Sequence, residues 1–209
     1  MTSSTSTAVD DGVVLLPPGV ELTPTKRRLY ETAMDLFGRH GYHAVSIRDI
    51  ATALGQQPSA IYFHVQSKQE LLYELALIGH RSHYEALRDA LLDAGSDPFE
   101  QVEALVAAHV GGHMTYPSMA RLTNRELGAL TPEQLQVVLG LRQQTEGLFI
   151  DVLDRGVRMK VFPQLDTFLA AKALGAMGVR LPEWWAPGGA RSREQIIETY
   201  TAFALKLVS

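Results

Sequence analysis

Turns that contain glycine divide residues 25–65 into three predicted helices, and this arrangement constrains the fold more than any other feature of the chain. Gly41 and Gly55 each follow a stretch in which apolar residues recur with helical spacing, and glycine commonly ends a helix. Ser46 is placed to cap the second helix. Pro58 suits the first turn of the third helix, because its missing N–H needs no partner there. Three helices connected in this way form a helix-turn-helix.

The rest of the chain also shows helical spacing. Thr25 is expected to cap the first helix, and Ser67 and Glu70 are expected to form a reciprocal capping box at the start of a long fourth helix. Further helices are predicted over 97–114, 117–128, 131–160, 163–181 and 192–208, and no alternation typical of a strand occurs. The sequence therefore predicts an all-α fold, with an N-terminal three-helix helix-turn-helix domain and a C-terminal helical domain.

Three regions are expected along the chain. Residues 1–23 are rich in Ser and Thr, lack sustained periodicity, and are interpreted as a flexible N-terminal tail. Residues 24–68 form the helix-turn-helix domain, which holds six basic and three acidic side chains although the whole chain carries a net charge of −4. Residues 69–209 form the larger domain. A basic module on an acidic body suggests that only the module meets a polyanion.

Composition and missing motifs exclude several classes of protein. The chain has no cysteine, which excludes disulfides, thiolate metal sites and cysteine catalysis. No apolar run approaches the roughly 20 residues that span a bilayer, and the start lacks the pattern of a signal peptide, so no membrane contact and a cytoplasmic location are expected. A Gly-rich phosphate loop, a Gly-x-Ser-x-Gly elbow and a His-Glu-x-x-His motif are absent, so the chain is not expected to be an enzyme.

The third predicted helix, residues 57–65, is expected to enter the major groove of DNA while the second helix braces it. Polar and cationic side chains around it suit contacts with bases and phosphates, and the N-termini of the second and fourth helices offer free N–H groups to phosphate oxygens. The predicted DNA-binding residues are Ser46, Arg48, Gln56, Gln57, Ser59, Tyr62, His64 and Lys68.

Four runs resemble the DNA-binding domain of TetR-family regulators. They are residues 33–42 (AMDLFGRHGY), 45–51 (VSIRDIA), 61–65 (IYFHV) and 67–72 (SKQELL). The resemblance implies a ligand-responsive regulator, by preference a repressor, that binds a palindromic double-stranded operator as a dimer and is released by a small hydrophobic effector. The segment 57–60 (QPSA) departs from the family, because a proline stands where a polar reading residue is usual.

Two alternatives belong to other functional classes. The first is a helical protein-interaction adaptor without specific DNA binding. The second is a metal site at His109 and His113, which are four residues apart on a predicted helix. Because no third ligand stands at a telling position, both are interpreted as polar residues that line or flank a cavity, and no metal or cofactor is expected. His80 and His83 are interpreted as solvated helix surface.

The effector site is expected in the larger domain. Flexible methionines suit an adaptable apolar pocket, and an arginine near its mouth suits phosphate. The predicted ligand-binding residues are Met114, Tyr116, Met119, Phe149, Arg180 and Trp184. The loop 184–189 (WWAPGG) and the cations after it resemble a TetR subgroup that senses acyl-CoA thioesters, which makes an acyl-CoA the implied effector; the alternative is a loop that seals the dimer interface. Residues 121–130 either hold a short helix through polar contacts or face the ligand.

The last two predicted helices, 163–181 and 192–208, are apolar over wide arcs. Obligate interfaces are apolar in this way, so a homodimer through these helices is predicted. The alternative is that both arcs face only the core of the same chain.

Overall fold

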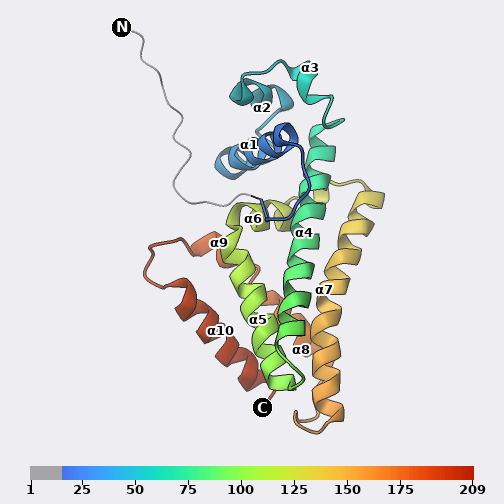
Figure 1. Cartoon of the computed structure of the whole chain (residues 1–209), viewed down its shortest axis with the longest axis vertical. Helices are drawn as coiled ribbons and strands as arrows, with labels where there is room; N and C mark the ends of the chain where they lie inside the picture. The colour runs from blue at the N-terminus through green and yellow to red at the C-terminus, as the bar shows by residue number, and fades with distance from the viewer. Residues whose placement is uncertain (1–15) are drawn as a thin grey trace.

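The computed structural model describes residues 16–209, and every regular element in that range is helical (Figure 1). No helix among these residues is long and apolar enough to cross a membrane. The elements are α1 (Pro24–His40), α2 (Ile47–Leu54), α3 (Pro58–Ile61), α4 (Lys68–Asp93), α5 (Pro98–Thr115), α6 (Pro117–Arg125), a 3-10 turn (Leu127–Ala129), α7 (Pro132–Arg158), α8 (Thr167–Ala176), α9 (Leu181–Trp184) and α10 (Arg193–Leu207). The predicted all-α fold is confirmed.

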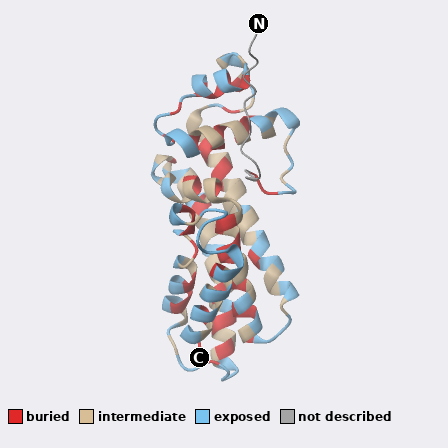
Figure 2. Ribbon diagram, turned by 90° about the vertical axis from the view of Figure 1, so that its left-hand side faces the viewer, coloured by how far each residue is buried: buried red, intermediate tan, exposed pale blue. Residues whose placement is uncertain are grey.

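Two hydrophobic cores lie along the molecule. The first joins α1, α2, α3 and the start of α4 to α6, and its buried side chains include Leu29, Ile50, Ile61, Leu72 and Met119. The second fills the bundle of α4, α5, α7, α8 and α10, with Leu105, Phe149, Leu153, Leu174 and Ile196. Figure 1 shows α1–α3 at one end and α4 running from that end into the bundle. Figure 2 shows buried residues on the inward sides of the helices along this length.

The turns around α2 follow the sequence signals closely. Gly41 and Gly55 have φ values of 82° and 67°, which glycine adopts without the strain of a side chain. Ser46 caps α2 as predicted: its hydroxyl accepts from the Asp49 N–H at 3.2 Å, and its own N–H donates to the Asp49 carboxylate at 2.7 Å. These caps fix where α2 begins and ends, and they therefore position α3 after it.

Two predicted caps differ from the structure. Thr23, rather than Thr25, caps α1, because Pro24 occupies the first helical position and leaves Thr25 inside the helix. Ser67 caps α4, but the reciprocal half of the predicted capping box is missing. Glu70 instead accepts a hydrogen bond from the Gln134 side chain at 3.0 Å, which ties the start of α4 to α7.

The lengths of two predicted helices were wrong. The third helix, predicted over 57–65, contains only the four residues of α3 and continues as turns. The helix predicted over 163–181 divides into α8 and α9, because Asp166 caps a later start and the helix ends before Gly178. At Gly178 the chain passes so close to the His109 ring that an added Cβ would lie 3.0 Å from it.

The predicted flexible tail, 1–23, falls partly outside the described residues. In its described part, Leu16 is buried in the first core and Leu22 packs against that core. The Val20 carbonyl accepts a hydrogen bond from Arg27 at 3.0 Å. The segment 16–23 therefore lies against the body of the protein, held there by apolar burial.

Candidate functional site

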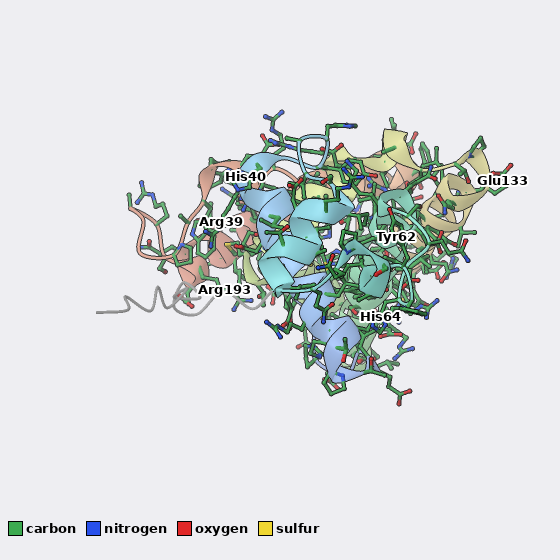
Figure 3. All side chains as sticks on the ribbon, turned by 90° about the horizontal axis from the view of Figure 1, so that it is seen from above. Arg39, His40, Tyr62, His64, Glu133 and Arg193 are labelled. Carbon is green, nitrogen blue, oxygen red and sulfur yellow. The ribbon has the colours of Figure 1, made fainter. Side chains whose placement is uncertain are left out.

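The predicted DNA-binding side chains lie around α2, α3 and the start of α4, and Figure 3, which views the molecule from this end, labels Tyr62 and His64 among them. Five of them are exposed: Ser46, Arg48, Gln57, Ser59 and Tyr62. Gln56, His64 and Lys68 are half-buried. Because α2, α3 and the start of α4 are consecutive around one core, the fold brings all eight residues to the same end.

Phe63 is the most exposed large apolar side chain at this end. It lies on the turn after α3 with an exposed fraction of 89%, beside Tyr62 at 55%. Phe63 is not among the predicted DNA-binding residues, since an apolar residue within a predicted helix is more often part of the core. Its exposure leaves an aromatic ring free to contact another molecule.

Lys68 is held by the protein more tightly than its sequence position suggested. Its ammonium donates to the carbonyls of Tyr42 and Val45, both at 3.0 Å, and lies 4.3 Å from the centre of the Tyr42 ring. Lys68 therefore locks the turn before α2 onto the start of α4.

A cavity of about 900 Å³ opens between α4, α5, α6, α7 and α8, with Pro17 and Pro18 at its edge. Four predicted ligand-binding residues line it: Tyr116, Met119, Phe149 and Arg180. Met114 does not line it but packs in the second core. Trp184 is also elsewhere and is 56% exposed, because the short α9 turns it outward while the neighbouring Trp185 packs inward.

The cavity contains a half-buried cation that sequence reasoning missed. Arg142 projects from α7, and burial lowers the pKa of its guanidinium. Within residues 16–209 its one hydrogen bond runs to the Asn124 side-chain oxygen at 2.9 Å, and no carboxylate lies within ion-pair distance. Glu146, which also lines the cavity, pairs with Lys172 at 2.7 Å instead. Arg142 follows an apolar stretch of α7, so only the packing reveals where it points.

Three histidines meet on the wall of this cavity. His83 comes from α4, while His109 and His113 come from α5. His83 Nε2 lies 2.9 Å from His109 Nδ1. Burial lowers the pKa of His109 to about 3 and that of the nearby His80 to about 4. The interpretation of His80 and His83 as solvated surface was wrong, because α5 and α6 cover this side of α4; His109 and His113 do line the cavity as expected.

Helix α6 separates the cavity from α1. Met119 and Thr123 of α6 line the cavity, and α6 also packs against α1. At its end, Glu126 lies 3.2 Å from His43, in the turn before α2. Of the residues 121–130, Asn124 lines the cavity, whereas Arg125 pairs with Glu183 at 2.9 Å; a contact with the ligand stays a prediction.

Two family models cover most of the chain. The model described as bacterial regulatory proteins, tetR family, matches residues 29–75, and the model described as the tetracyclin repressor-like C-terminal domain matches residues 95–208. The chain belongs to the TetR family. It is a DNA-binding transcriptional regulator of that family, and the adaptor alternative is not favoured.

Relatives of this TetR-family regulator match it over nearly its whole length. The HTH-type transcriptional repressor KstR2 of Mycobacterium tuberculosis is 25% identical over 187 residues, 88% of this chain and 93% of the relative. A tetR-family regulatory protein from Rhodococcus RHA1 is 27% identical, with a TM-score of 0.85 over 90% of this chain and 98% of the other. AibR, crystallised with isovaleryl coenzyme A and operator DNA, is 20% identical with a TM-score of 0.78 over 85% and 96%, and shows the same fold.

Proposed function

We propose that this regulator represses transcription by binding a near-palindromic operator as a homodimer, and that it leaves the operator when an acyl-CoA thioester occupies the cavity. The observation that carries the choice of effector is Arg142, a half-buried cation in a mainly apolar cavity. Other residues support the operator contacts, the dimer interface and the coupling between the cavity and the DNA.

Arg142 favours a ligand with acceptor oxygens. A guanidinium has five N–H donors, and a buried charge is costly unless it is paired. Within the described residues Arg142 uses one hydrogen bond, to a neutral amide oxygen. A phosphate or the thioester carbonyl of an acyl-CoA would accept from the remaining donors. Arg180 lies at the rim of the cavity, paired with Glu183 at 2.7 Å and largely exposed, where it can meet a second phosphate.

The remaining lining suits an acyl chain. Tyr116, Met119 and Phe149 supply apolar surface, and methionine adapts to chains of different shape. AibR shares this fold and was crystallised with isovaleryl coenzyme A and operator DNA, which supports a thioester over other apolar ligands. Arg193 is one of the cations that follow the loop 184–189. It is not proposed to bind the phosphates, because it donates to the Gly111 carbonyl and the Thr115 hydroxyl of α5.

The exposed polar residues around α3 are the proposed DNA contacts. Gln57 and Ser59 flank Pro58 at the start of α3 and are exposed; we expect them to contact base edges, and the exposed Tyr62 and Arg48 to contact phosphates. Lys68 has two of its three N–H donors bound to carbonyls and retains one for a phosphate.

The proposed dimer interface is the outer surface of α8 and α10. Phe168 and Leu169 of α8 are exposed by 54% and 61%, and Phe203 and Leu207 of α10 by 52% and 41%. Large apolar side chains that are exposed on a helix surface mark contact surfaces, and a two-fold dimer would present two copies of α3 to a two-fold operator.

The route from cavity to DNA is proposed to run through α6. This helix has Met119 and Thr123 on the cavity and touches α1 on its other side. A ligand that moves α6 changes the orientation of the helix-turn-helix in both protomers, so operator and ligand favour different conformations of one dimer.

Two steps test the proposal. Selection from random duplex DNA with the full-length protein should enrich a symmetric site whose half-sites are about one helical turn apart. The complex with that site is then titrated with acyl-CoA thioesters of increasing chain length and with the matching free acids. Release by thioesters alone supports the proposal. Failure to enrich any symmetric site contradicts operator binding, and equal release by free acids contradicts the thioester.

A further inference from the structure

We propose that His83, His109 and His113 form a binding site for one divalent transition-metal ion, with Zn²⁺ as the ion that the three imidazoles suit best. Each residue offers a ring nitrogen, and the three nitrogens lie within 4.8 Å of one another. Neutral imidazole is a preferred ligand of zinc, copper and nickel, whereas magnesium and calcium prefer oxygen. The inference concerns a different set of residues from Arg142 and does not depend on which effector the cavity takes.

The spacing needs only small side-chain movements to close around an ion. Zn²⁺ holds imidazole nitrogens at about 2.0–2.1 Å, which places two tetrahedral ligands about 3.3 Å apart. His83 Nε2 and His109 Nδ1 are 2.9 Å apart and share a hydrogen bond, so this pair must open by a few tenths of an ångström and the proton of His83 must move to its Nδ1. The third nitrogen, within 4.8 Å, must approach. Rotation of the rings about their side-chain bonds provides movements of this size.

The outer nitrogens of two rings are already held in the manner of metal ligands. His109 Nε2 is 3.0 Å from the Gly175 carbonyl, and His113 Nδ1 is 2.8 Å from the His109 carbonyl. Because a carbonyl only accepts, these two nitrogens carry the protons. The lone pairs therefore lie on His109 Nδ1 and His113 Nε2. Ligating histidines characteristically donate their second N–H to a carbonyl or carboxylate, which fixes the ring orientation.

Glycines make room for the rings. A Cβ on Gly178 would lie 3.0 Å from both the His109 and the His113 ring, and a Cβ on Gly112 would lie 3.0 Å from His83 Nδ1. Both distances are tighter than ordinary packing, so larger residues at these positions would displace the imidazoles. The three rings thus occupy space that the backbone leaves for them.

The fourth coordination position is expected to face the cavity. Three protein ligands and one open position are the arrangement of zinc sites that bind water or a further ligand. The guanidinium of Arg142 lies in the same cavity, so an anionic oxygen is the preferred fourth ligand, because it offsets both positive charges.

The test uses the full-length protein without a polyhistidine tag, after removal of metal with a chelator. Calorimetric titration with Zn²⁺ should show one ion per chain. The variants His83→Gln, His109→Gln and His113→Gln should each bind about 100-fold more weakly, as expected when one of three ligands is lost. His40→Gln is the control, because His40 is exposed at the end of α1. Absence of Zn²⁺ binding by the wild type, or wild-type affinity in all three cavity variants, overturns the proposal.

Two further measurements test the metal site even if a histidine variant fails to fold. Co²⁺ added to the wild-type protein should give the intense visible absorption of a four-coordinate site, whereas the weak spectrum of six-coordinate Co²⁺ contradicts it. Gly178→Ala should weaken Zn²⁺ binding by pressing on two rings, while Gly175→Ala should not, because nothing lies within 4 Å of a Cβ there. Equal affinities of the two alanine variants also contradict the site. These readouts are independent of operator release, so the metal site and the proposed effector fail or succeed separately.

Discussion

His43 Nε2 lies 3.2 Å from the Glu126 carboxylate, and this contact joins the turn before α2 to the end of α6. The other side of α6 lines the cavity through Met119 and Thr123. One helix therefore touches both the space for a ligand and the segment that positions α3. We therefore expect a small displacement of α6 to move the turn before α2.

The first prediction concerns this link. Glu126→Gln should leave operator affinity without effector within about twofold, because the contact is at the surface, where such pairs contribute about 0–1 kcal/mol. It should reduce the ratio between operator affinities without and with effector by about three- to fivefold, measured by fluorescence anisotropy. Asp35→Asn is the control, because Asp35 pairs with Arg39 at 2.9 Å within α1 and does not line the cavity. An unchanged ratio would show that the His43 contact does not carry the coupling.

The second prediction separates phosphate contacts from base contacts. Arg48→Gln should weaken binding to every DNA sequence and reduce the slope of log affinity against log salt by about one. Gln57→Ala should leave that slope unchanged and alter base preference at one position in each half-site. Both residues are exposed, so neither substitution should unfold the protein. If Gln57→Ala changed the salt dependence and Arg48→Gln changed the base preference, the assigned roles would be wrong.

The third prediction concerns the dimer. Leu169→Glu places a charge in an apolar interface and should give a monomer at micromolar concentration in analytical ultracentrifugation, with unchanged helix content. Val161→Glu changes an exposed apolar residue outside α8 and α10 and should remain dimeric. A dimer that tolerates Leu169→Glu, or a monomeric wild-type protein, contradicts the proposed interface.

The fourth prediction is a loss of stability in mild acid. Burial, followed by Arg142 of α7, lowers the pKa of His80 from 6.5 to about 4; His113 of α5 also faces this ring, and Thr123 of α6 accepts from it at 3.4 Å. The unfolded chain therefore binds this proton first, so stability is complete above about pH 6.5 and declines as the pH falls towards 4. The decline from His80 is on the order of 3 kcal/mol.

Urea denaturation at several pH values, in the presence of a chelator, measures this decline. His80→Gln should flatten the pH profile between pH 7 and 5, since glutamine does not titrate, while the remaining buried histidines keep part of the slope. An identical profile for the wild type and His80→Gln would show that His80 is not held neutral by the fold.

Local signals in the sequence predicted local structure well. The bounds of α2 could be predicted from the sequence alone, because the contacts that Ser46, Gly41 and Gly55 make lie within a few residues of each. The exposed positions of Gln57 and Tyr62 follow from α3 lying at the end of one small core. The length of α3 could not be predicted from the sequence, because the turn after it is set by the packing of Ile61 and Val65 against other helices.

The cavity was predicted only in part, because it is made by long-range packing. Helical spacing shows that His83 and Arg142 lie on helices but not which neighbouring helix each one faces. The i, i+4 spacing of His109 and His113 was visible, whereas the third histidine is 26 residues away from His109 on another helix. Trp184 was misplaced for a similar reason, because the predicted long helix ends early and α9 turns that side chain outward.

We propose above that an effector enters this cavity, binds Arg142 and releases the operator. The most direct measurement compares thioester concentrations needed for half-release of the operator by the wild type, Arg142→Gln and the exposed control Arg81→Gln. Arg142→Gln should bind the operator normally and need about 10- to 100-fold more thioester, the effect of losing a hydrogen bond to a charged group. Arg81→Gln should match the wild type. If Arg142→Gln is released at the wild-type concentration, the ligand does not bind where this account places it.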